Sequence, residues 1–449
     1  MPDRLVMLMN YNELNRMETV TLDWLGQTAT YTYDAAGRLA NLDNFNGTVS
    51  TYGYDDANRL TSLENRKSGG AVIATYQFEL DENGNRTNVI KDEPLTAVAA
   101  MENINYTYNT YKNRLLSDGA NSFGYDNEGQ ITTGYGSNYT FDYDHRLKTI
   151  GSSYTFTYDA TGNRLKAVRN GVETRYIYDA GGNLIAEADS NNVITRYYIY
   201  GQGLMAMVTP SDQVYCYHYN AIGSAIAMTD SSKNIVNKYA YDEFGNINNE
   251  VEAVSQPFKY VGQHGVMAEP NGFYYMRARF CDPKVGRFVS EDPSGFDGGD
   301  VNLYVYVGNN PVLMIDPEGL LSFAENFNRR RQLNGSILTK AIKTTASVAI
   351  GSLFNAAAKK EVGLGLGLGE LIKNRALIPV LGTSTNTIGN FILSSGFKSI
   401  AVGAAFFIGQ TVGNIIGAEL DTIVDNGSSS FLEKLSFGSG SPNTTYKGK

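Results

Sequence analysis

Alternating hydrophobic and polar positions dominate the first 250 residues, and one pattern returns in them from residue 31 to about residue 247. The pattern is aromatic, any residue, aromatic, Asp, then Gly or Asn before Arg and Leu, and its clearest copies begin at Tyr31, Tyr52, Phe156, Tyr176 and Tyr239. Side chains alternate between the two faces of a strand, so both rings of a copy lie on one face. Asp followed by Gly or Asn predicts a turn, because Asp accepts backbone hydrogen bonds and Gly or Asn tolerates positive φ. Each copy therefore predicts a β-hairpin.

A single hairpin of this kind cannot bury its aromatic face, so the copies are expected to stack on one another. Weaker copies begin at Tyr106 and Phe141, and the spacing between copies is irregular. Stacked hairpins predict a mainly β fold, in which a long antiparallel sheet spirals and the Tyr, Asp and Arg residues serve as scaffold.

Charge and tyrosine content divide the chain near residue 320 and predict two units with different roles. The first 320 residues hold 24 basic and 39 acidic residues, whereas the last 129 hold 13 basic and 7 acidic residues. Thirty of the 31 tyrosines lie in the acidic part. Residues 1–320 are therefore not expected to bind nucleic acid.

Three His and two Cys offer little material for a metal site or a disulfide framework, so no metal and no cofactor are expected. Cys216 and Cys281 are interpreted as reduced core residues, and His218 as a packed or surface residue of a strand. The first ten residues contain no apolar run long enough for a secretory signal. Delivery by other machinery, or descent from a longer ancestor, would account for this.

A second, ordered series of short motifs occupies residues 215–320. The series combines aromatic, Arg, Gly and Asp-Pro segments, which lie at 215–224, 229–230, 260–263, 273–283, 286–293, 298–299, 302–304, 309–311 and 316–320. A lone Asp-Pro pair carries little information, but the whole series in this order is specific.

The repeats and the series together resemble the YD-repeat (tyrosine-aspartate) family, which includes bacterial Rhs proteins, the C subunits of insecticidal toxin complexes and the teneurins. The resemblance covers about residues 28–320. It implies that the repeats wind into a hollow β-shell and that the later motifs form the Rhs-associated core. Only about ten repeats are visible, which leaves two arrangements open: an incomplete shell, and a shell that a partner closes.

The resemblance also implies an activity. In cleaved family members the core is an aspartyl autoprotease that cuts just after an Asp-Pro-x-Gly-Leu motif. Matched residue by residue, the two carboxylates are Asp292 and Asp316, the supporting cation is Arg279, and the scissile bond joins Leu320 to Leu321.

Paired carboxylates suit peptide hydrolysis, because two carboxylates held close together cannot both ionise and therefore share one proton. The ionised member draws a proton from water, while the protonated member polarises the scissile carbonyl. Arg279 is expected to hold one carboxylate ionised through a charge-assisted hydrogen bond. The alternative is that the Asp-Pro pairs at 292 and 316 only form turns.

The tail after residue 320 is, in Rhs-type proteins, variable and usually a toxin. Here it has no His and no Cys, which disfavours His-metal nucleases and Cys-dependent enzymes. Residues 399–418 carry no charge over 20 positions, about the span of a bilayer. Gly409, Gly413 and Gly417 fall on one face of a helix there and form a seam for helix packing.

A second Ala- and Ile-rich stretch, residues 336–358, has basic flanks that suit anionic membrane surfaces. The tail is therefore predicted to be α-helical, membrane-inserting and pore-forming. Three alternatives stay open: a buried helical hairpin of a soluble toxin, a helix-rich plug that lines the shell, and an enzymatic toxin of unrecognised class.

The predicted organisation has three parts: a YD-repeat shell at 1–250, a core with the autocleavage motif at 251–320, and a toxin tail at 321–449. The implied function is that of a secreted or surface-delivered Rhs-type polymorphic toxin. Its implied partners are an immunity protein, delivery machinery or a shell-completing protein, and a target membrane. Two alternatives are an adhesion or carbohydrate-binding module that needs no cut, and a displaced cassette that is useful only after recombination with a longer gene.

Overall fold

A computed structural model of the chain describes residues 6–98, 104–110, 112–320 and 323–324. The chain divides into two compact units, residues 1–329 and 330–449, and everything described lies in the first. The predicted α-helical tail lies outside the described residues, as do its glycines Gly409, Gly413 and Gly417 and the Leu321 side of the predicted cut.

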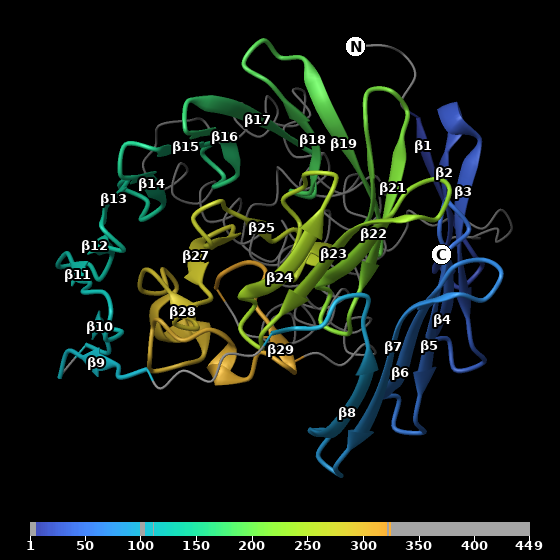
Figure 1. The fold of residues 1–449 in the computed structure, drawn as a ribbon, viewed down its shortest axis with the longest axis horizontal. Helices are drawn as coiled ribbons and strands as arrows, with labels where there is room; N and C mark the ends of the chain where they lie inside the picture. The colour runs from blue at the N-terminus through green and yellow to red at the C-terminus, as the bar shows by residue number, and fades with distance from the viewer. Residues whose placement is uncertain (1–5, 99–103, 111, 321–322, 325–449) are drawn as a thin grey trace, which may run out of the picture. The chain divides into compact units, whose positions relative to one another are not determined.

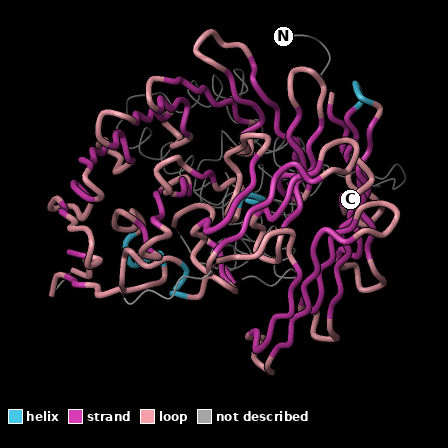
Figure 2. Tube along the Cα trace, in the orientation of Figure 1, coloured by secondary structure: helices cyan, strands magenta, loops and turns pink. Residues whose placement is uncertain are grey.

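The described part of the chain consists of antiparallel strands and a few single 3-10 turns, which confirms the predicted mainly β fold (Figure 1, Figure 2). An eight-stranded sheet contains, in order, β1 (Met7–Tyr11), β2 (Met17–Leu22), β3 (Gln27–Tyr33), β4 (Leu39–Asp43), β5 (Val49–Tyr54), β6 (Leu60–Arg66), β7 (Val72–Leu80) and β8 (Arg86–Asp92). A 14-stranded sheet contains β11 (Gly124–Tyr125), β12 (Ile131–Gly134), β13 (Ser137–Phe141), β14 (Leu147–Ile150), β15 (Tyr154–Tyr158), β16 (Arg164–Arg169), β17 (Val172–Tyr178), β18 (Leu184–Ala188), β19 (Ile194–Gly201), β20 (Gly203–Val208), β21 (Val214–Tyr219), β22 (Ala225–Thr229), β23 (Ile235–Tyr241) and β24 (Ile247–Glu252).

Smaller elements complete the unit. A four-stranded sheet contains β25 (Met267–Ala268), β26 (Tyr274–Met276), β27 (Arg279–Asp282) and β28 (Arg287–Phe288). Two short pairs join β9 (Thr107–Tyr108) to β10 (Leu115–Ser117) and β29 (Met314–Ile315) to β30 (Phe323–Ala324). The 3-10 turns are η1 (Asp23–Leu25), η2 (Gly262–His264), η3 (Gly295–Gly298) and η4 (Val307–Asn309). Residues 253–320, which follow the last strand of the larger sheet, are called the core segment below.

The turn between β3 and β4 shows how one repeat folds. The Asp34 carboxylate accepts the backbone N–H of Arg38 at 2.8 Å and also pairs with its guanidinium. Gly37, at a φ of 79°, donates its N–H to the Asp34 carbonyl at 2.8 Å. Asp55 and Arg59 repeat the carboxylate contacts in the next turn. The hairpin that the sequence pattern predicts is therefore confirmed, with Asp as the residue that closes its turn.

The Arg of a repeat also binds the following repeat, a contact that the pattern did not reveal. Arg38 donates from Nη1 to the Asp55 carbonyl at 2.9 Å, and Arg59 does the same to the Asp81 carbonyl at 2.7 Å. The Arg38 guanidinium also lies 4.9 Å from the ring centre of Tyr54. A planar guanidinium can serve its own turn, the next turn and a ring at once, which explains Arg rather than Lys at this position.

The two large sheets pack on each other, whereas the sequence predicted one long sheet. Tyr31 of the eight-stranded sheet shares a buried cluster with Met205 and Val208 of β20. Leu204 and Met207, on the other face of β20, belong to a second cluster that includes the core segment. The middle strands are therefore buried on both faces, which explains why residues 204–208 are uniformly apolar rather than alternating.

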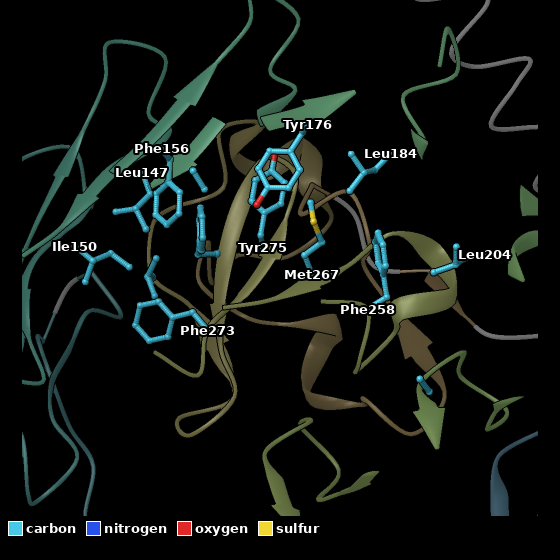
Figure 3. Close-up of a cluster of buried hydrophobic side chains, with 14 of the residues drawn as sticks. Leu147, Ile150, Phe156, Tyr176, Leu184, Leu204, Phe258, Met267, Phe273 and Tyr275 are labelled. Carbon is cyan, nitrogen blue, oxygen red and sulfur yellow. The ribbon is translucent and has the colours of Figure 1, made fainter. Parts of the chain in front are cut away.

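The core segment packs against the 14-stranded sheet through aromatic side chains (Figure 3). Phe156 of β15 lies with its ring centre 5.3 Å from that of Phe280 in β27. Tyr198 of β19 meets Phe258 edge to face at 4.8 Å. These ring contacts place the start and the middle of the core segment on the aromatic face that the repeats create.

The remaining sequence assignments are settled by burial. Cys216 and Cys281 are buried free thiols, as predicted. His218 is fully buried and its Nε2 lies 2.8 Å from Thr229 Oγ1, so it is a packed strand residue. Burial lowers the pKa of His218 to about 3, which keeps the ring neutral. Within the described ranges, no helix is long and apolar enough to cross a membrane.

Candidate active site

Three charged side chains from separate stretches of the core segment meet at one buried place. Arg279 begins β27, Asp292 lies in the loop after β28, and Asp316 directly follows β29. They are 4%, 9% and 2% exposed, respectively. Burying charges is costly unless they are paired, so three of them together mark a candidate functional site.

Arg279 bridges the two carboxylates with a single nitrogen atom. Its Nη2 lies 2.8 Å from Oδ2 of Asp292 and 3.4 Å from Oδ2 of Asp316. Burial lowers the pKa of Arg279, and the two carboxylates act in the opposite direction by stabilising its charge. One cation therefore faces two carboxylates. The structure thus brings together all three residues that the sequence assigned to this site.

The other donors of Arg279 fix its position. Nη1 donates to the Leu303 carbonyl at 3.0 Å, and Nε donates to the Gly319 carbonyl. The guanidinium carbon lies 3.5 Å from the ring centre of Phe288, which adds a cation–π contact. The Arg279 guanidinium is therefore held by two carbonyl oxygens and an aromatic ring, as well as by the carboxylates. One of these hydrogen bonds goes to the peptide group directly before Leu320.

Leu320, the residue before the predicted cut, contacts the loops that carry Asp292 and Asp316. Leu320 donates its backbone N–H to Oδ1 of Asp316 at 3.2 Å. Its carbonyl oxygen lies 3.4 Å from Oγ of Ser294, whose hydroxyl and backbone N–H both donate to Oδ1 of Asp292. The carbonyl group of Leu320, which water would attack in a cut after this residue, therefore lies next to the carboxylate pair.

Two glycines make this approach possible. A Cβ on Gly298 would lie 2.6 Å from Oδ2 of Asp292 and 3.1 Å from the Leu320 carbonyl oxygen, so the missing side chain leaves that space open. A Cβ on Gly319, whose φ is 68°, would lie 2.4 Å from the Met276 carbonyl oxygen. Only glycine fits at Gly319, because both the close approach and the left-handed backbone exclude other residues.

A small pocket with a cavity volume of about 20 Å³ opens over this group. Its lining includes Arg279, Asp292, Asp316, Gly298, Asp300 and Asn302. A polar cavity of this size has room for about one water molecule beside the carboxylates. The arrangement therefore contains the parts that peptide hydrolysis requires: two carboxylates, a cation, room for water and a positioned carbonyl.

A repeat supports the Asp292 loop from the other side. Glu291 lies 3.1 Å from Nη2 of Arg114 and also accepts the Tyr304 hydroxyl at 3.1 Å. Arg114 is the Arg of the repeat that begins at Tyr106. The backbone N–H of Ile131 donates to the Val289 carbonyl at 3.1 Å. The shell therefore contacts the residue next to Asp292.

A third Asp-Pro aspartate, Asp282, belongs to a different contact. Its Oδ2 accepts the Tyr135 hydroxyl at 2.6 Å, and its Oδ1 accepts the backbone N–H of Lys284. Burial raises the pKa of Asp282 to about 6. Asp282 therefore anchors the core segment to the larger sheet.

Sequence reasoning did not assign roles to Ser294, Gly298, Gly319 or Glu291. Glu291, Gly298 and Gly319 lie inside motifs of the ordered series, whereas Ser294 lies between two of them. Their partners lie elsewhere in the chain. Within the part of the chain that the structure describes, no three His, Cys, Asp or Glu side chains are grouped as metal ligands would be.

Comparison with known proteins agrees with the fold and the motifs. The teneurin YD-shell family model matches residues 3–312, more than half of the chain. The chain belongs to the teneurin YD-shell family. As a YD-shell protein it shares the fold of a crystal structure of TcdB2-TccC3-TEV, with a TM-score of 0.52 and 18% identity over 70% of this chain and 20% of that one.

Three curated relatives have higher identity to the chain, one named as a nuclease and two named as toxins. The tRNA3(Ser)-specific nuclease WapA of Bacillus spizizenii is 35% identical over 266 residues, which cover 56% of this chain and 11% of WapA. Toxin protein Tse5 of Pseudomonas aeruginosa is 32% identical over 124 residues, 27% of this chain and 9% of Tse5. Double-stranded DNA deaminase toxin A of Burkholderia cenocepacia is 30% identical over 167 residues, 35% of this chain and 11% of the deaminase. The chain thus spans about a tenth of the length of these relatives.

Proposed function

We propose that this chain is the shell and core of a Rhs-type polymorphic toxin that cuts itself once, between Leu320 and Leu321, and so releases residues 321–449. The observation that carries the proposal is the Arg279 nitrogen between the carboxylates of Asp292 and Asp316, with Leu320 held at both aspartate loops. The names of Tse5 and the deaminase toxin support the toxin class.

The proposed step is hydrolysis. Water adds to the Leu320 carbonyl carbon, and the ionised carboxylate takes its proton while the protonated one supplies a proton to the carbonyl oxygen. The tetrahedral intermediate collapses, the bond to the Leu321 nitrogen breaks, and the amine leaves with a proton from the pair. The products are a Leu320 carboxylate and a free amine on Leu321. The two aspartates act as one titrating unit, so no fixed acid and base are assigned.

Positioning replaces substrate binding in this reaction, because the scissile bond belongs to the same chain. Asp316 accepts the Leu320 N–H, and Arg279 holds the Gly319 carbonyl, so the peptide on the amino side of the bond is fixed by the residues that cut it. One turnover is sufficient for release.

Expression of the full chain tests the proposal. Two fragments are expected, of about 320 and 129 residues by the position of the bond, and their proportion should not depend on protein concentration, because the cut is intramolecular. A soluble and folded wild-type chain that stays intact at 49.1 kDa would refute it. That outcome would favour the adhesion or carbohydrate-binding alternative, which needs no cut.

For the released tail we propose insertion into a target membrane. The uncharged stretch at 399–418 and the basic flanks of 336–358 support this. The names of the relatives do not indicate an activity for the tail, because they describe different activities. An enzymatic toxin of another class is the alternative. An immunity protein for the tail, secreted delivery and a delivery or shell-completing partner belong to the same proposal.

Residues 321–449, made alone, are expected to release a dye from liposomes of anionic lipid. Liposomes of neutral lipid should leak less, because the basic flanks bind anionic surfaces. Absence of both leakage and membrane association would eliminate the pore and leave the enzymatic alternative.

A further inference from the structure

Ser294 occupies a position that the proposed reaction has not yet used. It lies two residues after Asp292, immediately before η3, and it is an exposed residue. Its backbone N–H donates to Oδ1 of Asp292 at 2.8 Å, and its hydroxyl contacts the same oxygen. Its Oγ is also 3.4 Å from the Leu320 carbonyl oxygen.

We propose that Ser294 is a further catalytic residue, which donates its hydroxyl hydrogen to the Leu320 carbonyl oxygen as that oxygen becomes negative. The inference rests on the proposed autocleavage and deepens it. A serine hydroxyl carries one hydrogen and therefore serves one acceptor at a time. In the uncut chain that hydrogen has two acceptors in reach, Oδ1 of Asp292 and the Leu320 oxygen.

The transfer between these acceptors follows from the charges in the reaction. As water adds to the Leu320 carbonyl, and before the protonated aspartate has transferred its proton, the carbonyl oxygen gains negative charge and becomes the better acceptor. When a proton resides on Asp292, its Oδ1 loses acceptor strength, and the hydroxyl turns toward Leu320. A donor already within reach needs little reorganisation, which is the basis of oxyanion stabilisation. No bond to Ser294 forms or breaks.

A hydroxyl beside an Asp is not enough to carry this inference, because the hairpin turns contain the same contact. Thr161 donates its backbone N–H to Oδ1 of Asp159 at 2.8 Å and its hydroxyl to the same oxygen at 2.7 Å. Thr161 lies in the turn between β15 and β16. The feature that distinguishes Ser294 is the second acceptor, the carbonyl of Leu320.

The space around this carbonyl fits the role. Gly298, at the end of η3, has no side chain to fill the gap between Asp292 and the Leu320 oxygen. Ser294 approaches the same oxygen from the start of η3. One short turn therefore supplies both the opening for the reacting carbonyl and the hydroxyl that contacts it.

The test is the rate of cutting in full-length chains made by cell-free translation, followed as the new chains mature. Ser294→Ala is expected to cut about 100-fold more slowly than wild type, the loss typical of one oxyanion donor. Ser294→Thr keeps a hydroxyl and is expected to restore most of the rate. Thr161→Ala removes the matching turn contact and is expected to cut at the wild-type rate.

Two results would overturn the inference. Ser294→Ala cutting at the wild-type rate would show that the hydroxyl does nothing. A rate of cutting for Ser294→Ala that falls well beyond about 10³-fold below wild type, the upper limit for one oxyanion donor, would show a role other than a single donor. If the autocleavage proposal is wrong, the wild-type chain itself stays intact. That result is distinct from both outcomes above, which concern Ser294 alone. Equal melting temperatures for Ser294→Ala and wild type, each combined with Asp316→Asn, would exclude a folding defect.

Discussion

Replacing Asp316 with Asn is expected to leave the full-length chain uncut, with a rate of cutting about 10²- to 10⁴-fold below wild type. Asn has nearly the same shape as Asp, and its amide oxygen can still accept the Leu320 N–H. It cannot accept or release a proton, and it cannot pair with Arg279 as a charge. The carboxylate pair would then have one titrating member, so the acid and base roles could no longer be divided. The yield of the two fragments after a fixed time measures the effect.

Asp282→Asn is the matched control for this change. Asp282 is also a buried aspartate before a proline, but it binds Tyr135 rather than Arg279. Burial raises the pKa of Asp282 to about 6, so the site favours an uncharged side chain and Asn should fit it. We expect Asp282→Asn to cut like wild type. If Asp316→Asn cuts as fast as its control, the paired-carboxylate mechanism is wrong.

Replacing Glu269 with Gln is expected to destabilise the described unit by about 3–5 kcal/mol. Glu269, in the core segment, lies 2.6 Å from Nη1 of Arg164 and 2.7 Å from Nε of Arg169, both in β16. The side chains of Glu269 and Arg164 have no exposed surface. Gln would leave two guanidinium groups in the interior without a counter-charge. The midpoint of urea unfolding, measured in an Asp316→Asn background so that the chain stays whole, reports the loss.

The pH dependence gives this prediction a second readout. Burial acts to raise the pKa of Glu269, but Arg164 and Arg169 prevail and lower it below its usual value near 4.5. The pair therefore stabilises the fold above pH 4.5, and the contribution is lost as the pH falls through the folded-state pKa. Glu269→Gln should lack this part of the acid sensitivity.

Glu173→Gln provides the comparison on the surface. Glu173 pairs with Arg175 at 2.7 Å at a partly exposed position of β17. Exposed ion pairs contribute little, so this variant is expected to unfold almost like its parent. Equal unfolding midpoints for Glu269→Gln and Glu173→Gln would mean that the buried pair does not tie the core segment to the repeats.

The sequence was a good guide to the hairpins and to the three charged residues of the site. Both rest on short-range patterns. The turn of a repeat is closed within five residues, as at Asp34 and Arg38. Each site residue belongs to a short motif that can be recognised by itself. The resemblance to a family then joined those motifs, and the fold brings Arg279, Asp292 and Asp316 together.

The contacts that could not be predicted join residues far apart in the chain. Arg114 and Glu291 are 177 positions apart, and Arg164 and Glu269 are 105 apart. A period-two pattern sets which face of a strand a side chain occupies, but not which distant segment covers that face. For the same reason the pattern predicted one sheet, and the packing of two sheets on β20 appeared only in the structure.

Contacts next to the site also link the repeats to the core segment. The three charged residues of the site come from the core segment, but Glu291 next to Asp292 is held by Arg114 of a repeat. Correct placement of the carboxylates therefore depends on the repeat that contacts them. If cleavage requires the folded shell, the tail stays attached until the shell has folded.

The amino-terminal sequence of the smaller fragment, from the purified wild-type chain, tests the proposed cleavage between Leu320 and Leu321. We predict that the fragment begins Leu-Ser-Phe-Ala-Glu, starting at Leu321, and that it is absent from Asp292→Asn and Asp316→Asn. An intact wild-type chain, a fragment that begins at another residue, or an unchanged fragment in the aspartate variants would contradict the account.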